Sequence, residues 1–87
     1  MHEKKLNFRP EIDLRGMRAD EALTATAYFI DDAIQCEQSR VRILHGTGTG
    51  ALRTIVRNYL GTVNGVRRFH DEHVQFGGAG VTVVELE

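Results

Sequence analysis

The stretch His45-Gly46-Thr47-Gly48-Thr49-Gly50-Ala51-Leu52-Arg53 joins a short apolar run to a helical pattern through a loop of alternating glycines. Glycine adopts backbone conformations closed to other residues and lets the backbone approach a ligand closely. We expect the amides of Gly48, Gly50 and Ala51 to be free at the start of the helix, where anions bind favourably. His45 precedes the loop and has a side chain that titrates near neutral pH. The stretch therefore predicts a phosphate-binding loop beside an acid-base group.

Length and composition predict one small domain. The chain of 87 residues is 41% hydrophobic, which suffices for a single core, and we place the domain at residues 11–87 after a tail or linker over residues 1–10. The single cysteine, Cys36, excludes an internal disulfide and a cysteine-rich zinc site and fits a reducing compartment. The charged N-terminus is followed by no apolar run long enough for a signal peptide or a membrane span. We therefore expect a cytoplasmic protein with no membrane partner.

The overall charge gives little support to nucleic-acid binding. The formal net charge is -1, whereas non-specific nucleic-acid binders usually carry a basic excess. The basic residues of the domain are all arginines, whose planar guanidinium group matches phosphate oxygens. Each of them can equally be an ordinary surface charge with an acidic neighbour.

The rest of the sequence alternates between strand and helix patterns. Strand patterns cover residues 11–14, 40–44, 66–70 and 81–86. Helix patterns cover residues 18–36 and 51–60, with apolar stripes formed by Ala22, Leu23, Thr26, Phe29, Ile30, Ala33 and Ile34 in the first and by Leu52, Ile55, Val56, Tyr59 and Leu60 in the second. The β-α-β-α-β-β order predicts an α/β fold, an α+β two-layer sandwich in which two helices pack on a mixed sheet of about four strands.

Two polar segments should meet at one edge of this sheet. The first two strands are expected to be parallel, because a helix connects them, and their carboxyl ends then share an edge. Asp13-Leu14-Arg15-Gly16 ends the first strand and His45-Gly46-Thr47-Gly48 ends the second. Ligands of open α/β sheets bind outside such carboxyl ends.

Three motifs, taken in order, resemble those of the Smr (small MutS-related) domain. They are Ile12-Asp13-Leu14-Arg15-Gly16, the stretch from His45 to Arg53, and Gly77-Gly78-Ala79-Gly80-Val81-Thr82-Val83-Val84-Glu85-Leu86. Together with the helices between them they span essentially residues 11–87. Many Smr domains have histidine where Arg15 stands, and the arginine form resembles the subgroup at the C-terminus of bacterial MutS-like ATPases.

The resemblance implies a function as well as a fold. It implies a domain that binds DNA or RNA by structure rather than sequence and nicks it as an endonuclease. It also implies a parent chain with an ATPase domain that acts in recombination suppression through DNA cleavage, or in ribosome rescue through contacts with RNA or the ribosome.

Asp13, Arg15 and His45 are the candidate catalytic residues. Phosphodiester cleavage needs an activated nucleophile, charge stabilisation on the phosphoryl oxygens and a proton for the leaving oxygen. His45 can act as base or acid, Asp13 can orient it, act as base or bind a metal, and Arg15 can neutralise the phosphoryl group. Asp13 is the only acid in either loop, so we predict no tightly bound metal; a single loosely held Mg²⁺ or Mn²⁺ in DNA cleavage stays open. RNA is the easier substrate because it supplies its own 2′-hydroxyl nucleophile, whereas the resemblance supports DNA at least as strongly.

Further residues are candidates for phosphate binding. Arg53 and Arg57 are one helical turn apart and are expected on a face away from the apolar stripe. The full set is Gly46, Thr47, Gly48, Thr49, Gly50, Arg53, Arg57, Gly78 and Gly80.

Each assignment has a structural alternative. His45 can be a strand-end residue satisfied by hydrogen bonds, and Asp13 can stabilise the following turn. The aromatic residues Tyr28, Phe69 and Phe76 are too dispersed for a stacking platform and are expected in core or edge packing. At the level of the whole domain, the alternative to an endonuclease is a non-catalytic module that docks a larger ATPase on nucleic acid or the ribosome. A binder of nucleotides or small phosphates is a third class, although the loop lacks a Walker lysine.

Overall fold

The computed structural model describes residues 8–87. The elements are β1 (Glu11–Asp13), α1 (Ala19–Gln35), β2 (Arg40–Leu44), α2 (Ala51–Leu60), β3 (Val66–Asp71), the 3₁₀ turns η1 (Val74–Phe76) and η2 (Gly78–Gly80), and β4 (Val81–Leu86). The predicted β-α-β-α-β-β order is confirmed. The two 3₁₀ turns were not predicted from the sequence, and β3 runs one residue further than expected, to Asp71.

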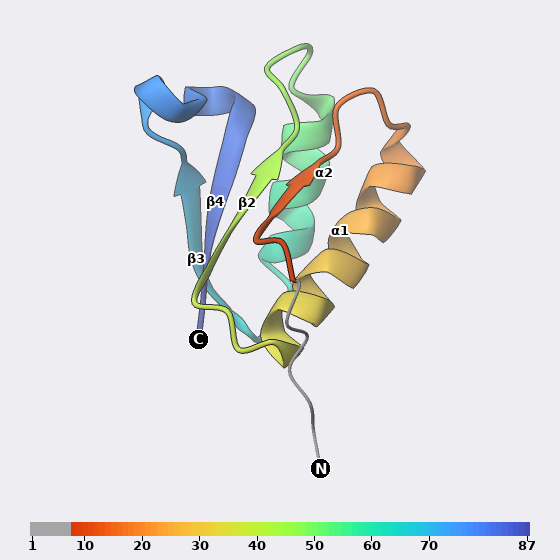
Figure 1. Ribbon diagram of the computed structural model, residues 1–87. Coiled ribbons are helices and arrows are strands. Elements are labelled where there is room, and N and C mark those ends of the chain that lie inside the picture. The colour runs from red at the N-terminus through yellow and green to blue at the C-terminus, as the bar shows by residue number, and fades with distance from the viewer. Residues whose placement is uncertain (1–7) are drawn as a thin grey trace.

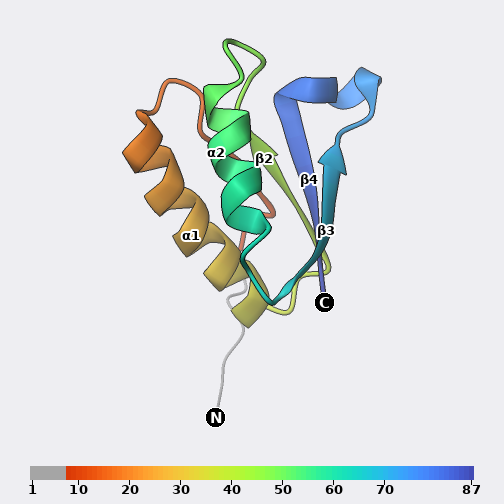
Figure 2. The same ribbon diagram turned by 180° about the vertical axis from the view of Figure 1, so that it is seen from behind.

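The four strands form one mixed sheet in the order β1-β2-β4-β3. β1 is parallel to β2, as predicted, while β4 lies antiparallel to both β2 and β3. Both helices cover the same face of the sheet, so the predicted two-layer α+β architecture is confirmed (Figures 1 and 2). The strand directions place the carboxyl ends of β1, β2 and β3 and the start of β4 at one edge, at the top of Figure 1.

The core lies between the helices and the sheet. It consists of the buried residues Leu14, Ala22, Phe29, Ile30, Ala33, Val41, Ile43, Val56, Leu60, Val84 and Leu86. The predicted stripe of α1 is wrong at Leu23 and Ile34, which are 41% and 39% exposed. Leu23 lies over a surface groove that Tyr59 of α2 also lines, so the stripe of α1 is wider than the surface available to bury it.

The chain before β1 contacts the domain from Phe8 onward. Residues 1–7 of the predicted tail lie outside the described residues. The Phe8 ring stacks on Phe29 with centroids 5.6 Å apart, and the Pro10 carbonyl accepts a hydrogen bond from the Arg42 amide at 2.9 Å. Among the described helices, none is long and apolar enough to cross a membrane.

Replacement of Leu14 by alanine tests the core. Leu14 is fully buried, directly after β1, so Leu14→Ala should lower the free energy of unfolding by about 2–5 kcal/mol. Leu23→Ala makes the same chemical change at a partly exposed position of α1 and should cost less than about 1 kcal/mol. Urea unfolding measures both values, and equal losses would contradict this description of the core.

Candidate functional site

Three segments meet at the carboxyl edge of the sheet. The Leu14 amide donates to the Leu44 carbonyl at 2.7 Å, which places the end of β1 beside the end of β2. The amides of His45 and Gly46 both donate to the Gly80 carbonyl, at 3.1 and 3.0 Å. The predicted meeting of the first two segments is therefore confirmed, and the turn before β4 joins them.

The glycine loop between β2 and α2 has the conformation that its sequence predicts. Gly46 and Gly50 have φ angles of 78° and 82°, in the left-handed region that favours glycine. Within residues 8–87, the amides of Gly48 and Gly50 have no hydrogen-bond partner. The expected free amide of Ala51 is wrong, because the Thr49 hydroxyl accepts from it at 3.3 Å. The backbone from His45 to Leu52 surrounds a hollow of about 160 Å³.

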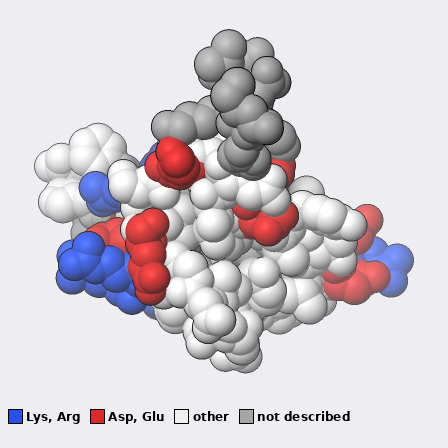
Figure 3. All heavy atoms as spheres, turned by 90° about the horizontal axis from the view of Figure 1, so that it is seen from below, with Lys and Arg blue, Asp and Glu red and all other residues white. Residues whose placement is uncertain are grey.

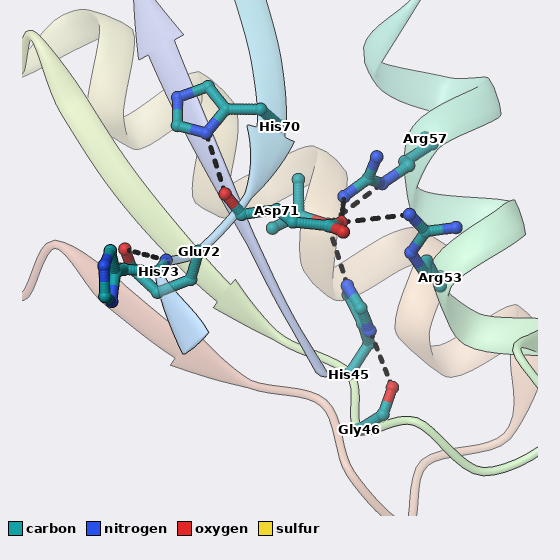
Figure 4. A network of polar contacts seen from close by, with 9 residues as sticks. His45, Gly46, Arg53, Arg57, His70, Asp71, Glu72 and His73 are labelled. Carbon is teal, nitrogen blue, oxygen red and sulfur yellow. Dashed lines mark hydrogen bonds and ion pairs between the residues drawn. The ribbon is translucent and has the colours of Figure 1, made fainter. Parts of the chain in front are cut away.

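His45 is buried, and both of its ring nitrogens are hydrogen-bonded inside the fold (Figure 4). Nδ1 lies 2.9 Å from the Gly46 carbonyl, which can only accept, so Nδ1 carries the proton. Nε2 then accepts from the Thr82 hydroxyl at 2.8 Å. Burial is the main cause that lowers the pKa of the His45 imidazole from its ordinary 6.5, and the nearby charges of Arg57 and Arg53 add to this effect. The ring is therefore held neutral, in one tautomer.

Arg57 continues this chain of hydrogen bonds from Thr82 to Asp71. Its Nε donates to the Thr82 hydroxyl at 3.2 Å, and its terminal nitrogen donates to Asp71 Oδ1 at 2.5 Å. Arg53 donates to the same Asp71 oxygen at 2.9 Å (Figure 4). These bonds from Arg53 and Arg57 hold the pKa of the Asp71 carboxyl below its usual value. Asp71 and Thr82 were missed as site residues, because no local motif links them to the glycine loop.

The predicted outward position of Arg57 is wrong. Its side chain is only 21% exposed, and its guanidinium carbon lies 5.7 Å from the centre of the Phe69 ring. The physical reason is that α2 lies beside the end of β3, so its polar face meets the sheet instead of water. Arg53 is more exposed at 38%, yet its Nε is buried without a hydrogen-bond partner in residues 8–87. Their roles in phosphate binding stay predictions.

Asp13 and Arg15 form a two-pronged ion pair at the end of β1. Arg15 Nε and a terminal nitrogen donate to the two Asp13 oxygens at 2.9 and 2.7 Å, and the Arg15 amide adds a bond of 3.0 Å. The Arg15 side chain lowers the pKa of Asp13 to about 2. The turn-stabilising alternative for Asp13 is thus present in the structure. Both side chains remain exposed, so a ligand can reach them.

Arg15 also lies beside the glycine loop. A Cβ atom on Gly46 would lie 3.5 Å from Cγ of Arg15, and one on Gly80 would lie 3.6 Å from the Gly46 backbone. These close approaches form the wall of a second hollow of about 300 Å³, lined by Arg15, Gly46, Thr47, Phe76, Gly77 and Gly80 among others. Gly78 is the first residue of η2, the turn that contains Gly80, and does not itself line this hollow.

Residues 8–87 hold no group of three or more His, Cys, Asp or Glu side chains arranged around a common point. Both oxygens of Asp13 are bonded to Arg15, whereas a divalent cation needs several free oxygen ligands.

Fold and site together define a small α+β domain that carries a glycine loop at the carboxyl edge of its sheet. A family model described as the Smr domain matches residues 12–87. The crystal structure of the Smr domain of Thermus thermophilus MutS2 superposes with a TM-score of 0.87 at 42% identity, covering 91% of this chain and 99% of that one. The chain belongs to the Smr domain family, as its motifs predicted.

The chain is similar to one part of longer MutS2 proteins and to a stand-alone small MutS-related protein. Endonuclease MutS2 of Geobacillus sp. (strain WCH70) is 46% identical over 77 residues, which are 88% of this chain and 10% of that protein. Endonuclease MutS2 of Pelotomaculum thermopropionicum is 46% identical over 84 residues, 95% of this chain and 11% of the relative. YdaL, a stand-alone small MutS-related protein from Escherichia coli, has the same fold, with a TM-score of 0.86 at 23% identity over 90% of this chain and 64% of its own. The chain thus spans about a tenth of the curated MutS2 relatives.

The neutral state of His45 predicts a characteristic dependence of stability on pH. Its pKa is lower in the folded than in the unfolded chain, so its contribution is complete above the unfolded value of 6.5 and is lost as pH falls below it. His70 has the opposite sign, because hydrogen bonds to the Asp71 carbonyl and to Glu85 raise its pKa. Carboxyl groups titrate mainly below about pH 5. Between about pH 5 and 6.5 the change in stability therefore comes chiefly from His45, whereas the His70 contribution is lost as pH rises past 6.5.

The measurement is the free energy of unfolding between about pH 5 and 7. His45→Gln should flatten the rise of stability with pH, and the matched control His70→Gln should steepen it, because the His70 contribution falls as pH rises. Identical pH slopes in both variants and the unsubstituted chain would contradict the buried, neutral state of His45.

Proposed function

We propose that this domain binds the nucleic-acid backbone at the glycine-loop edge and cleaves a phosphodiester there as a largely sequence-independent, structure-selective endonuclease. The observation that carries the proposal is the meeting of the unpaired amides of Gly48 and Gly50 with the exposed Asp13–Arg15 pair at one edge. Family membership and the name endonuclease carried by the MutS2 relatives support it.

The loop residues 46–50 would hold the phosphate. Backbone amides at the start of α2 point toward this edge, where the helix dipole also favours an anion. The hydroxyls of Thr47 and Thr49 add exposed donors, and Arg53 lies in the first turn of α2. At the end of the molecule opposite to the loop, the blue and red groups of residues 8–87 that Figure 3 shows lie near one another around a largely white centre.

Asp13 and Arg15 would carry the chemistry through an exchange of partners. Asp13 with a pKa of about 2 is a weak base while Arg15 is bonded to it. When the Arg15 side chain turns to a phosphoryl oxygen, its hydrogen bonds to Asp13, the largest cause of the lowered pKa, are lost while the bond from the Arg15 amide remains, so the carboxylate becomes a stronger base as the substrate binds. Asp13 can then orient and deprotonate water, or the 2′-hydroxyl of RNA. That oxygen attacks phosphorus as the bond from phosphorus to the leaving oxygen breaks, and solvent water supplies the proton that the leaving oxygen takes up. The proposal needs no metal step.

We assign His45 the role of a positioning residue for the glycine loop. As an acid or base it would first have to give up its bond to Gly46 or to Thr82, whereas as a neutral donor it holds the Gly46 carbonyl and with it the shape of the loop. This is the structural alternative considered from the sequence, and the geometry favours it.

The second candidate function is a docking module without catalysis. The engaged ring of His45 and the neutralised carboxylate of Asp13 favour it. In either case we propose that the domain works within a larger chain, which the length of the MutS2 relatives supports. A cytoplasmic MutS-like ATPase as that parent chain, with a role in recombination suppression on DNA or in ribosome rescue, is what the resemblance of the motifs implies.

Asp13→Asn separates the two functions. It keeps the size of the side chain and removes its charge, so cleavage should fall by about 100-fold or more while affinity changes by less than about twofold. Single-stranded RNA, duplex DNA and branched DNA are tested with and without EDTA. Asp31→Asn, on the exposed face of α1, is the matched control and should cleave normally. Binding without cleavage by the unsubstituted chain would favour the docking module, and undiminished cleavage by Asp13→Asn would exclude Asp13.

Arg53→Ala tests where the backbone binds. Each lost phosphate contact should lower the slope of log K against log salt by about 1 on duplex DNA, without a change in base preference. Arg67→Ala is the control, because Arg67 is exposed near the start of β3, whereas the carboxyl end of β3 lies at the edge of the glycine loop. A reduced slope for Arg67→Ala and an unchanged one for Arg53→Ala would place the nucleic acid away from the loop.

A further inference from the structure

The face of the sheet that the helices leave open carries two adjoining hollows. The hollow of about 300 Å³ beside the glycine loop is lined by Arg42 and Phe76 among others, and a larger hollow of about 530 Å³ is lined by the same two residues together with Pro10, Arg40, Glu72 and His73. Glu72 is the one carboxylate among the described residues of this lining, and it is bonded to Arg42. Arg40 and Arg42 alternate along β2 with the core residues Val41 and Ile43, so they lie on the open face. A continuous surface therefore runs from the loop along β2.

Phe76 stands where the two hollows meet. Its side chain belongs to η1 and the residue is 63% exposed, which makes the expected core or edge packing wrong. Its carbonyl accepts from Arg42 at 2.8 Å, and the His73 ring lies 5.9 Å away at an angle of 54°. The ring is thus positioned by its neighbours while much of it faces water. An exposed aromatic ring at the wall of a hollow is suited to stacking.

Arg40 is less engaged by carboxylates than Arg42, although its charge adds to the His73 amide and Arg42 in lowering the pKa of the Glu72 carboxyl. Arg42 is paired with Glu11 and Glu72, but Arg40 has no hydrogen bond or ion pair with any of residues 8–87. A guanidinium group in this state is available to an anionic ligand.

We propose that an unpaired segment of nucleic acid runs from the glycine loop across Phe76 to Arg40, with one base stacked on Phe76 and a phosphate at Arg40. The inference rests on the proposed function, because it extends the same strand beyond the loop. Single strands bind by this combination of an aromatic face and a cationic groove, and a paired base cannot offer its face to the ring. The substrate class is therefore nucleic acid with unpaired nucleotides beside the bound phosphate. A peptide has neither a base that could stack on Phe76 nor a phosphate that could contact Arg40, so these two side chains favour nucleic acid over a peptide.

The test uses the whole chain, a single-stranded oligonucleotide that contains 2-aminopurine, and the matching duplex. Binding should quench the fluorescence of the single strand, and Phe76→Ala should remove the quench and weaken single-strand affinity about tenfold while duplex affinity changes less than twofold. Phe76→Trp should restore both. Val74→Ala, in the same turn and 87% exposed, is the control and should behave like the unsubstituted chain. Arg40→Ala should lower the salt slope on the single strand by about 0.7.

Several outcomes would overturn the inference. An intact quench in Phe76→Ala, an equal loss of single-strand and duplex affinity with an unchanged melting temperature, or no rescue by Phe76→Trp would each do so. Normal duplex binding and cleavage without any quench of the single strand would agree with the proposed endonuclease function and contradict the path over Phe76 and Arg40. If the unsubstituted chain binds neither the single strand nor the duplex, both the proposed function and this inference are contradicted.

Discussion

One carbonyl group connects the two halves of the site. The Gly80 carbonyl accepts from the consecutive amides of His45 and Gly46, which fixes the end of β2 against the start of β4 and sends the following residues away from the sheet as a loop. Because this docking sets the position of β4, the side chain of Thr82 reaches the His45 ring, and that ring in turn holds the Gly46 carbonyl. The shape of the glycine loop thus depends on a strand far along the sequence.

Ion pairs and hydrogen bonds connect the residues around the loop with α2 and β3. Asp71 bonds both Arg53 and Arg57, and Arg57 bonds Thr82, so one carboxylate organises two cations directly behind His45. The same cations disfavour a proton on His45 and support its neutral state. Apart from Arg53 Nε, which is buried without a partner in residues 8–87, the side chains of this network are hydrogen-bonded to one another, and such bonds specify one arrangement of loop, helix and sheet.

The local parts of this architecture could be predicted from the sequence, whereas only some of the residues of the site could. The β2-loop-α2 unit and the parallel pairing of β1 with β2 follow from periodicity, glycine spacing and the crossover helix, all within short segments. The contact of His45 with Thr82 spans 37 positions and depends on β4 pairing between β2 and β3, an order that alternation alone does not determine. The exposure of Phe76 depends on a 3₁₀ turn without apolar periodicity. Long-range pairing, and not local propensity, decides these features.

The distribution of charge explains how a chain with a net charge of -1 is suited to phosphate. Most arginines near the site are already paired inside the fold: Arg15 with Asp13, Arg42 with Glu11 and Glu72, Arg53 and Arg57 with Asp71, and Arg68 with Glu85. A phosphate that takes one of these cations must displace a carboxylate, so the gain in free energy is small. The amides of Gly48 and Gly50 and the side chain of Arg40 have no hydrogen-bond or ion-pair partner within residues 8–87. In the proposed function, anion recognition would therefore depend on the backbone geometry of the loop more than on the total charge of the chain, and a few donors without a partner would suffice for it.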